Sequence, residues 1–236
     1  MNLNVSNVLT GALIGAGLLA IGLGVRSGLK AIPDSERTVE VRGLATREVQ
    51  ANQVTWPIVF KQVGNELPEV YAAVSKTNDA IVEYLKTNGI DAKEISVSAP
   101  SMTDLSADRY NNQPIPFKYS VTSVVTVSSE QVEKVHDLIN RQGELLSRGI
   151  PIISNDYSNQ VSYSYTELNS IKPEMIAEAT QNAREAAKKF ADDSDSEIGK
   201  IKSARQGQFS IEDRDNYTPY IKSVRVVTTL TYYLED

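Results

Sequence analysis

Two acidic loops contain the residues of this chain that are best suited to acid–base chemistry. A pair of carboxylates can divide the roles of general acid and general base when both converge on one substrate. The sequence places these carboxylates in polar hairpin loops, where charged side chains commonly face solvent or a neighbouring subunit. A hydrolase is therefore one hypothesis, and a charged loop without catalytic activity is the interpretation that we favour. The loops contain Asp104 and Asp108 with Arg109, and Glu212, Asp213 and Asp215 with Arg214.

A further acidic cluster, Asp192, Asp193, Asp195 and Glu197, has the alternating carboxylates that calcium prefers. An EF-hand loop that began at Asp193 would need glycine at its sixth position and glutamate at its twelfth. The sequence has Ile198 and Ala204 at these positions. We interpret the cluster as the solvated end of a helix, and the sequence predicts no metal and no cofactor.

Tyrosine is frequent, with eleven copies against four phenylalanines. Because the tyrosine ring is apolar and its hydroxyl is polar, tyrosines at alternating strand positions can form a platform for a glycan or a peptide. Half-buried strands and subunit interfaces are also rich in tyrosine, and this alternative stays open. The candidates for a binding surface or an interface are Tyr163, Tyr165, Tyr217, Tyr220, Tyr232 and Tyr233.

The composition excludes several classes of protein. Without a cysteine, the chain cannot be a thiol peroxidase, a disulfide carrier or a cysteine-ligated metalloprotein. The single histidine, His136, lies off the apolar stripe of its predicted helix, so we interpret it as a surface side chain. The net charge is −6 and the basic residues form no run, which argues against a nucleic-acid partner.

Residues 8–25 contain no charged residue, proline, asparagine or glutamine, and the basic residues Arg26 and Lys30 follow them. At about 1.5 Å per residue this segment spans roughly 27 Å, which predicts one transmembrane helix with flanking side chains at the interface. Small residues recur every four positions, so they line one face and allow another helix to approach closely. This candidate seam for self-association consists of Ala12, Ala16, Ala20, Gly24 and Gly28.

Two alternatives concern this segment. A cleaved signal peptide would need a basic start and a small-residue cleavage site, and neither is present. The positive-inside rule, applied to Arg26, Lys30 and Arg37, favours a cytoplasmic body, although only three basic residues support that orientation. Residues 1–36 are therefore predicted to be a membrane anchor and linker, and residues 37–236 to be one folded domain.

Within this domain, alternating apolar residues predict strands over 37–45 and 48–63 that join near Thr46 and Arg47, with Pro57 at an edge or a bulge. Periodicity predicts a helix over 68–88, whose apolar stripe includes Leu67 and Tyr71, and a helix over 129–142 that begins with a Ser128–Gln131 capping box. A third helix opens at Pro173, and its alanine-rich stripe, which includes Ile176 and Phe190, would let it pack close to a sheet. Strands are expected over 94–105, 117–127, 149–153, 160–168, 198–209 and 220–234, with a loop over 210–219. The expected fold class is α+β, with helices packed on antiparallel sheets with long hairpins.

The two units of helix plus hairpin form a weak internal repeat. Asp108-Arg109-Tyr110-Asn111 in the first loop corresponds to Asp213-Arg214-Asp215-Asn216 in the second. The last strand is longer than most, and long strand edges favour pairing with another chain. This pattern predicts a homo-oligomer.

Four segments make the chain resemble the SIMPL-domain family of bacterial envelope proteins, over about residues 38–233. None of them is a catalytic signature. The resemblance implies an extracytoplasmic body, a ring-like or channel-like homo-oligomer, and members linked to oxidative stress, with no established enzymatic activity. The segments are residues 39–54, Leu85 to Ser98, Tyr119 to Val127 and Ala183 to Ile201.

The sequence as a whole therefore predicts a membrane-anchored, non-enzymatic envelope protein that self-assembles and has a structural or stress-related role. We expect a single-pass protein of the inner membrane with its domain in the periplasm, because the resemblance outweighs the three basic residues. One alternative is a periplasmic glycan-binding or peptide-binding module that uses the tyrosines. The other is a hydrolase that uses the acidic loops.

Overall fold

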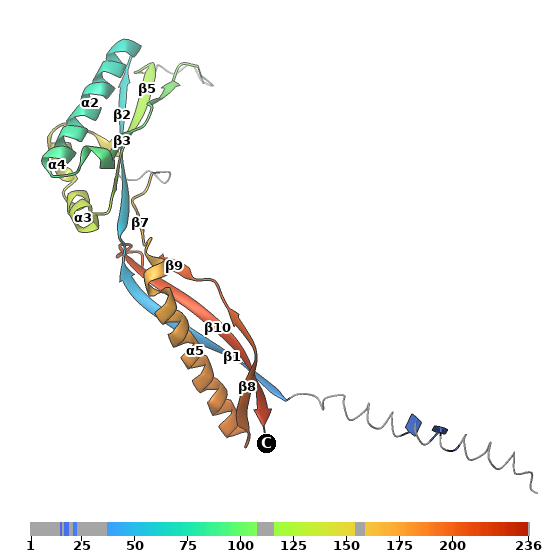
Figure 1. Cartoon of the computed structure of the whole chain (residues 1–236). Coiled ribbons are helices and arrows are strands. Elements are labelled where there is room, and N and C mark those ends of the chain that lie inside the picture. Colours follow the sequence, from blue (N-terminus) through green and yellow to red (C-terminus); the bar gives the residue numbers. More distant parts are fainter. Residues whose placement is uncertain are drawn as a thin grey trace, which may run out of the picture. The chain divides into compact units, whose positions relative to one another are not determined.

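Figure 1 shows the computed structural model of the protein, which describes residues 37–107, 116–153 and 159–235 and five single residues between 15 and 22. Helices and antiparallel sheets make up the fold, which confirms the predicted α+β class. The strands are β1 (Thr38–Gln50), β2 (Gln53–Gly64), β3 (Ile95–Val97), β4 (Ser101–Asp104), β5 (Tyr119–Ser129), β6 (Ile152–Ile153), β7 (Ser162–Ser164), β8 (Glu197–Gln206), β9 (Ser210–Asp213) and β10 (Ile221–Glu235). The helices are α2 (Leu67–Thr87), η1 (Ala92–Glu94, 3-10), α3 (Val132–Asn140), α4 (Gly143–Ser147) and α5 (Leu168–Asp193).

The predicted membrane span at residues 8–25 lies outside the described residues, apart from the five single positions. Its stripe of small residues, from Ala12 to Gly28, is also outside them. Among the residues that are described, no helix is both long enough and apolar enough to cross a membrane.

The folded part divides into two compact units. The larger unit consists of residues 44–179 and 207–227. The described residues of the smaller unit are 37–43, 180–206 and 228–235. Strands β1 and β10 and helix α5 contribute residues to both units.

A sheet with the order β3–β5–β2–β6 forms the centre of the larger unit. In addition, β4 pairs with β5, and β7 pairs with β2. Alternate residues of β2 and β5, such as Trp56, Phe60 and Val125, are buried on the face that α2 covers (Figure 1). Because the apolar residues of α2 recur every three or four positions, Ile81 and Leu85 meet this face. The main core therefore lies between α2 and the sheet, and it also receives side chains from α3 and α4.

The second sheet has the order β1–β10–β8, with β9 also paired to β10. In the larger unit, Met175 and Ala179 of α5 pack on Val224 and Val226 of β10. In the smaller unit, Ala183 and Ala187 of α5 are buried with Leu230 and Tyr232 of β10. Small side chains allow a helix backbone to lie close to a sheet, as the alanine-rich pattern predicts.

The predicted turn at Thr46 and Arg47 is wrong, because β1 continues to Gln50 and only Ala51 and a bend at Asn52 separate it from β2. β1 also pairs with β10, whereas β2 pairs with β5 in the other sheet. Thr46 and Arg47 fit a strand because they continue the alternation of exposed and less exposed residues along β1. Two polar residues in succession therefore did not mark a turn here.

Pro57 is neither at the edge of its sheet nor in a bulge, since β2 is an interior strand. It faces Thr126 of β5 on one side. On the other side, the pairing of β2 with β7 ends at Thr55 and the pairing with β6 begins at Val59. A proline donates no backbone hydrogen bond, so this gap accommodates it.

The helix starts also differ from the predictions. Helix α5 begins at Leu168, so Pro173 lies inside the helix and does not open it. The helix tolerates this proline because it removes only one backbone donor near the start of a helix that is 26 residues long. The Ser128–Gln131 capping box is absent, since Gln131 is the N-cap of α3 and makes no side-chain capping bond. A capping box occurs instead at η1, between Asp91 and Glu94. Helix α4 was not predicted.

Two further predictions change in detail. Part of the expected loop over 210–219 is strand β9. On α5, Phe190 is exposed and Ile176 is only partly buried, whereas Met175 and Ala191 are buried. The helix contacts the sheet over a narrower and more alanine-rich stripe than the sequence suggests.

Candidate functional site

The structure brings together His136 of α3, Tyr163 of β7 and Tyr220, which immediately precedes β10. Nδ1 of His136 lies 2.9 Å from the hydroxyl oxygen of Tyr163, within hydrogen-bond distance. The ring centroids of His136 and Tyr220 are 4.7 Å apart, and those of Tyr163 and Tyr220 are 6.2 Å apart with an edge-on geometry. Such tilted contacts are the arrangement that aromatic rings prefer, so the three rings form one cluster.

Local structure explains why these rings meet. Val135 and Leu138 of α3 are buried in the main core, and this orients the neighbouring His136 along the edge of that core. Tyr163 is the buried residue of β7, with only 8% of its surface exposed. The backbone N–H of Ala51 donates to the carbonyl oxygen of Tyr220 at 2.8 Å, which fixes the start of β10 beside the short connection between β1 and β2.

A pocket of about 310 Å³ opens over this cluster. His136 and Tyr220 provide its aromatic wall, and the helix α3 contributes Val132 and two carboxylates. Burial and the neighbouring Tyr220 hydroxyl raise the pKa of Tyr163, so this side chain stays neutral and can hydrogen-bond His136 at physiological pH. The remaining lining residues are Gln50, Ala51, Glu133 and Asp137.

A second, more polar hollow of about 500 Å³ shares part of this lining. Three glutamates face it, and its one lysine, Lys134, donates to the carbonyl oxygen of Gly89 at 3.2 Å and also to Gln131. The two hollows together therefore present an acidic surface around an aromatic wall. The glutamates are Glu130, Glu133 and Glu167.

Of the six candidate tyrosines, Tyr163 and Tyr220 meet in the aromatic cluster with His136. Tyr165 lines the second, more polar hollow and packs beside the Met175 cluster, and Tyr217 is 93% exposed in the loop before β10. In the smaller unit, Tyr232 is buried, whereas Tyr233 lies under the ammonium group of Lys202, 5.3 Å from its ring centroid.

His136 is not the isolated surface side chain that we inferred from the sequence. It is half-buried and contacts two aromatic rings. Helical periodicity did not reveal this role, because β7 and the segment before β10 reach His136 only through the tertiary fold. The one sequence feature that could have indicated this contact was the position of His136 next to Val135, which is buried.

The acidic loops do not form a shared site in the described part of the chain. Hydrogen bonds from the side chain and backbone of Ser106 lower the pKa of Asp104, and Asp213 pairs with Lys222. Asp215 accepts bonds from Thr218 and Arg214, which hold its pKa well below the ordinary value.

Neither these carboxylates nor the exposed Glu212 line the two hollows around His136. Asp108 and Arg109 lie outside the described residues. The hydrolase hypothesis therefore has no converging carboxylates to support it in this part of the chain. Among the same residues, the Asp192–Glu197 cluster forms no group of three ligands that could hold a metal.

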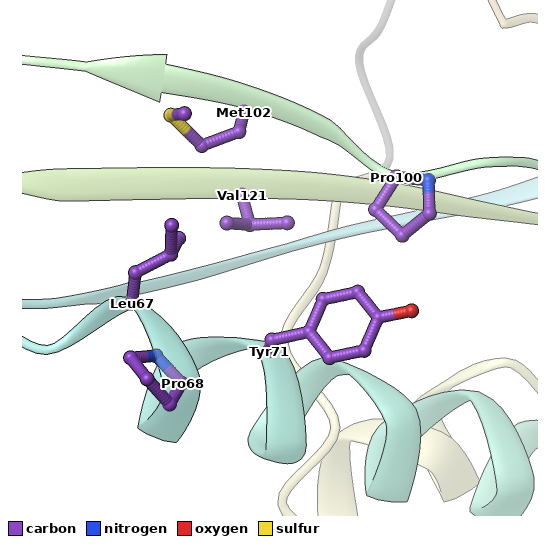
Figure 2. Close-up of a pocket in the computed structure, with 6 residues that line it drawn as sticks. All are labelled: Leu67, Pro68, Tyr71, Pro100, Met102 and Val121. Carbon is purple, nitrogen blue, oxygen red and sulfur yellow. The ribbon is translucent and has the colours of Figure 1, made fainter.

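An apolar groove of about 430 Å³ lies elsewhere in the larger unit, between the first turn of α2 and the strands β4 and β5 (Figure 2). Leu67 and Tyr71 belong to the apolar stripe that predicted this helix, yet Tyr71 is 60% exposed. The groove contains no carboxylate, histidine or basic side chain, so it offers no acid–base chemistry. Its lining is Leu67, Pro68, Tyr71, Pro100, Met102 and Val121.

Comparison with known families now adds to this geometry. Residues 39–228 match the model of SIMPL, described as a protein of unknown function (DUF541). The chain belongs to the SIMPL family. The match starts within β1 and ends within β10, so the SIMPL domain includes both sheets and the aromatic pocket. A comparison with curated proteins finds no match.

The segments that carried the resemblance occupy structural positions in this SIMPL domain. Residues 39–43 are in β1, residues 119–127 are in β5, and the other two segments run from α2 to β3 and from α5 to β8. They define strands, helices and turns, and only the first of them, through Gln50 and Ala51, lines the pocket around His136. Family membership therefore establishes the fold and leaves the activity open.

Proposed function

We propose that this SIMPL protein is a non-enzymatic envelope protein with a structural or stress-related role, anchored in the inner membrane by one N-terminal helix. In this proposal, its folded domain lies in the periplasm and assembles into a homo-oligomer. The observation that carries the proposal is strand β8, which occupies one end of the β1–β10–β8 sheet. Eight of the ten residues of β8 are exposed.

An exposed edge of this length is a template for pairing with another chain, because no other strand of the described residues pairs with its outward side. β1, with 13 residues, forms the opposite end of the same sheet. Pairing of β8 with β1 of a second copy would extend the sheet from subunit to subunit. Such a head-to-tail contact closes into a ring when the rotation between copies permits it.

The register of β8 identifies the backbone groups that face outward. The N–H of Gly207 donates to the carbonyl oxygen of Val227 at 2.8 Å. The backbone N–H and C=O groups of Gly207 and of the alternate residues Arg205 and Ser203 therefore point toward β10. The N–H groups of Ala204 and Gln206 consequently point away from β10. A proline at Ala204 would remove an outward donor and leave the β8–β10 bonds in place.

The test of assembly is the mass of the full chain in detergent, with and without Ala204→Pro. We expect the unchanged chain to be an oligomer and the variant to be a folded monomer with unchanged circular dichroism. The control is Ala92→Pro in η1, which leaves β8 intact and should leave the mass of the oligomer unchanged. A monomeric parent chain, or a variant that keeps the full mass, would rule out assembly through β8.

The anchor and its orientation can be tested without altering a native cysteine, because the chain has none. Tyr217→Cys places a single thiol at a position whose native side chain is 93% exposed. We expect a membrane-impermeant maleimide to label it in intact spheroplasts and the protein to stay in the membrane pellet after a carbonate wash. Labelling only after lysis would place the domain in the cytoplasm.

A second candidate function is a binding module, and the pocket around His136 and Tyr220 favours it. This corresponds to the tyrosine-based glycan or peptide module considered from the sequence, with a smaller set of tyrosines. The pocket combines a concave shape, an aromatic wall and a few polar groups, which is the usual composition of a ligand site.

A further inference from the structure

We propose that the pocket around His136 and Tyr220 binds an organic cation, either an ammonium or a guanidinium group. The proposal deepens the second candidate function, because it names the ligand class of the same pocket. It rests on three features of the described residues: the pocket, its aromatic wall and its unpaired carboxylates.

The aromatic wall favours a cation. The face of an aromatic ring carries negative charge density, and a cation within about 6 Å of the ring centre is attracted to it. Tyr220 lines the pocket and is only partly buried, so part of its ring is accessible. His136 packs against Tyr220 and is itself held by the hydroxyl of Tyr163, so the wall is set before a ligand arrives.

The charges point to the same class of ligand. Glu133 and Asp137 lie one helical turn apart on α3, on the side that carries His136, and both line the pocket. Within the described part of the chain, neither carboxylate forms a salt bridge. Arg141, which follows Asp137 by one turn, is bound to Glu144 at 2.8 Å, and its electrostatic interaction with Asp137 is weaker than that with Glu144. Among the described residues, no lysine or arginine lines the pocket.

These features discriminate among ligand classes. An anion would meet two carboxylates and no basic side chain, so it should be rejected. A neutral sugar could stack on Tyr220 but would leave both carboxylates without a countercharge. A cation can contact the aromatic face of Tyr220 and also neutralise the two carboxylates. The adjacent hollow with Glu130 and Glu167 can accept a second positive charge of a longer molecule.

Calorimetric titration of the full chain in detergent tests the proposal with four probes. N-acetyl-arginine amide represents a cation carried by a peptide, and spermidine represents a free polyamine. N,N′-diacetylchitobiose is the neutral probe and N-acetyl-glutamate is the anionic probe. We expect at least one cation to bind, more tightly than either of the other two classes.

Variants connect binding to the pocket. Tyr220→Leu keeps an apolar side chain but removes the aromatic face, and we expect about tenfold weaker cation binding. Glu133→Gln and Asp137→Asn change exposed side chains, so folding should be unaffected, and we expect each to weaken binding by about three- to tenfold. The matched controls are Tyr217→Leu and Asp79→Asn, which alter exposed residues outside the pocket and should leave binding unchanged.

The outcomes separate the ligand class from the function. If the neutral or anionic probe binds more tightly and Tyr220→Leu weakens it, the pocket is a binding site and the cation assignment is wrong. If none of the four probes binds, or if a cation binds equally well to the three pocket variants, both the assignment and this second candidate function are refuted.

Discussion

Leu230 lies in the core of the smaller unit. Its side chain is 2% exposed and is buried with Val41, Ala183, Ala187 and Tyr232. Two of these four neighbours are alanines, so few atoms are available to fill a space that opens beside them. We predict that Leu230→Ala destabilises the smaller unit severely.

The size of the effect follows from two contributions. Replacing leucine by alanine removes three carbon atoms from the core, which costs about 2.4 kcal/mol at about 0.8 kcal/mol per buried group. A residual cavity of roughly 50 Å³ adds about 1.2 kcal/mol at about 24 cal/mol per Å³. The expected loss is therefore about 3.5 kcal/mol, a large part of the roughly 5–15 kcal/mol that stabilises a typical domain.

The assay combines urea unfolding, followed by circular dichroism, with amide hydrogen exchange. Because Leu230 is paired with Ala204, exchange should accelerate most in β8 and in the second half of β10. Leu146→Ala is the matched control, since Leu146 is 52% exposed and the same change should cost well under 1 kcal/mol. A loss below about 1 kcal/mol for Leu230→Ala would refute the close packing of α5 on this sheet.

Two other predictions concern the larger unit. A Cβ atom at Gly64 would lie 2.6 Å from Cγ2 of Val70, so Gly64→Ala should lower the free energy of unfolding in urea by about 1–3 kcal/mol. Gly143→Ala is the control, because a Cβ atom there would have no neighbour within 4 Å, and this change should be neutral or stabilising. Equal losses for the two variants would contradict the clash. Burial raises the pKa of Tyr84 and of Tyr163, so the unfolded chain loses these protons first and stability should fall as the pH rises above about 10. Urea midpoints at pH 8 and pH 11 check this, and Tyr84→Phe should reduce the difference between them.

The sequence predicted features that depend on local periodicity. Helix α2 lies within one residue of its predicted bounds, because a long apolar stripe between Pro68 and Gly89 has few alternatives. The long pairing of β5 with β3 and β4 also follows the predicted hairpin, with a break between Val97 and Ser101. In these elements the pattern and its partners are close in the chain.

Features that depend on distant partners were missed. Strands β1 and β2 have similar patterns of alternating apolar residues. They belong to different sheets only because β1 pairs with β10 and β2 pairs with β5. The contact between His136 and Tyr163 spans 27 positions, and Tyr220 is more distant still. Tyr71 fits the stripe of α2 but faces a groove, because periodicity identifies the face of a helix and does not show how far the opposing sheet extends.

The two proposals can be separated by experiment because they involve different parts of the chain. Strand β8 belongs to the smaller unit, and every residue that lines the aromatic pocket belongs to the larger one. Effects at sites that share no contacts usually add. Ala204→Pro should therefore abolish assembly without changing cation affinity, and Glu133→Gln should weaken cation binding without changing the mass. If Ala204→Pro also abolished binding, the pocket would need a neighbouring subunit to be complete, and assembly and ligand recognition would be one function.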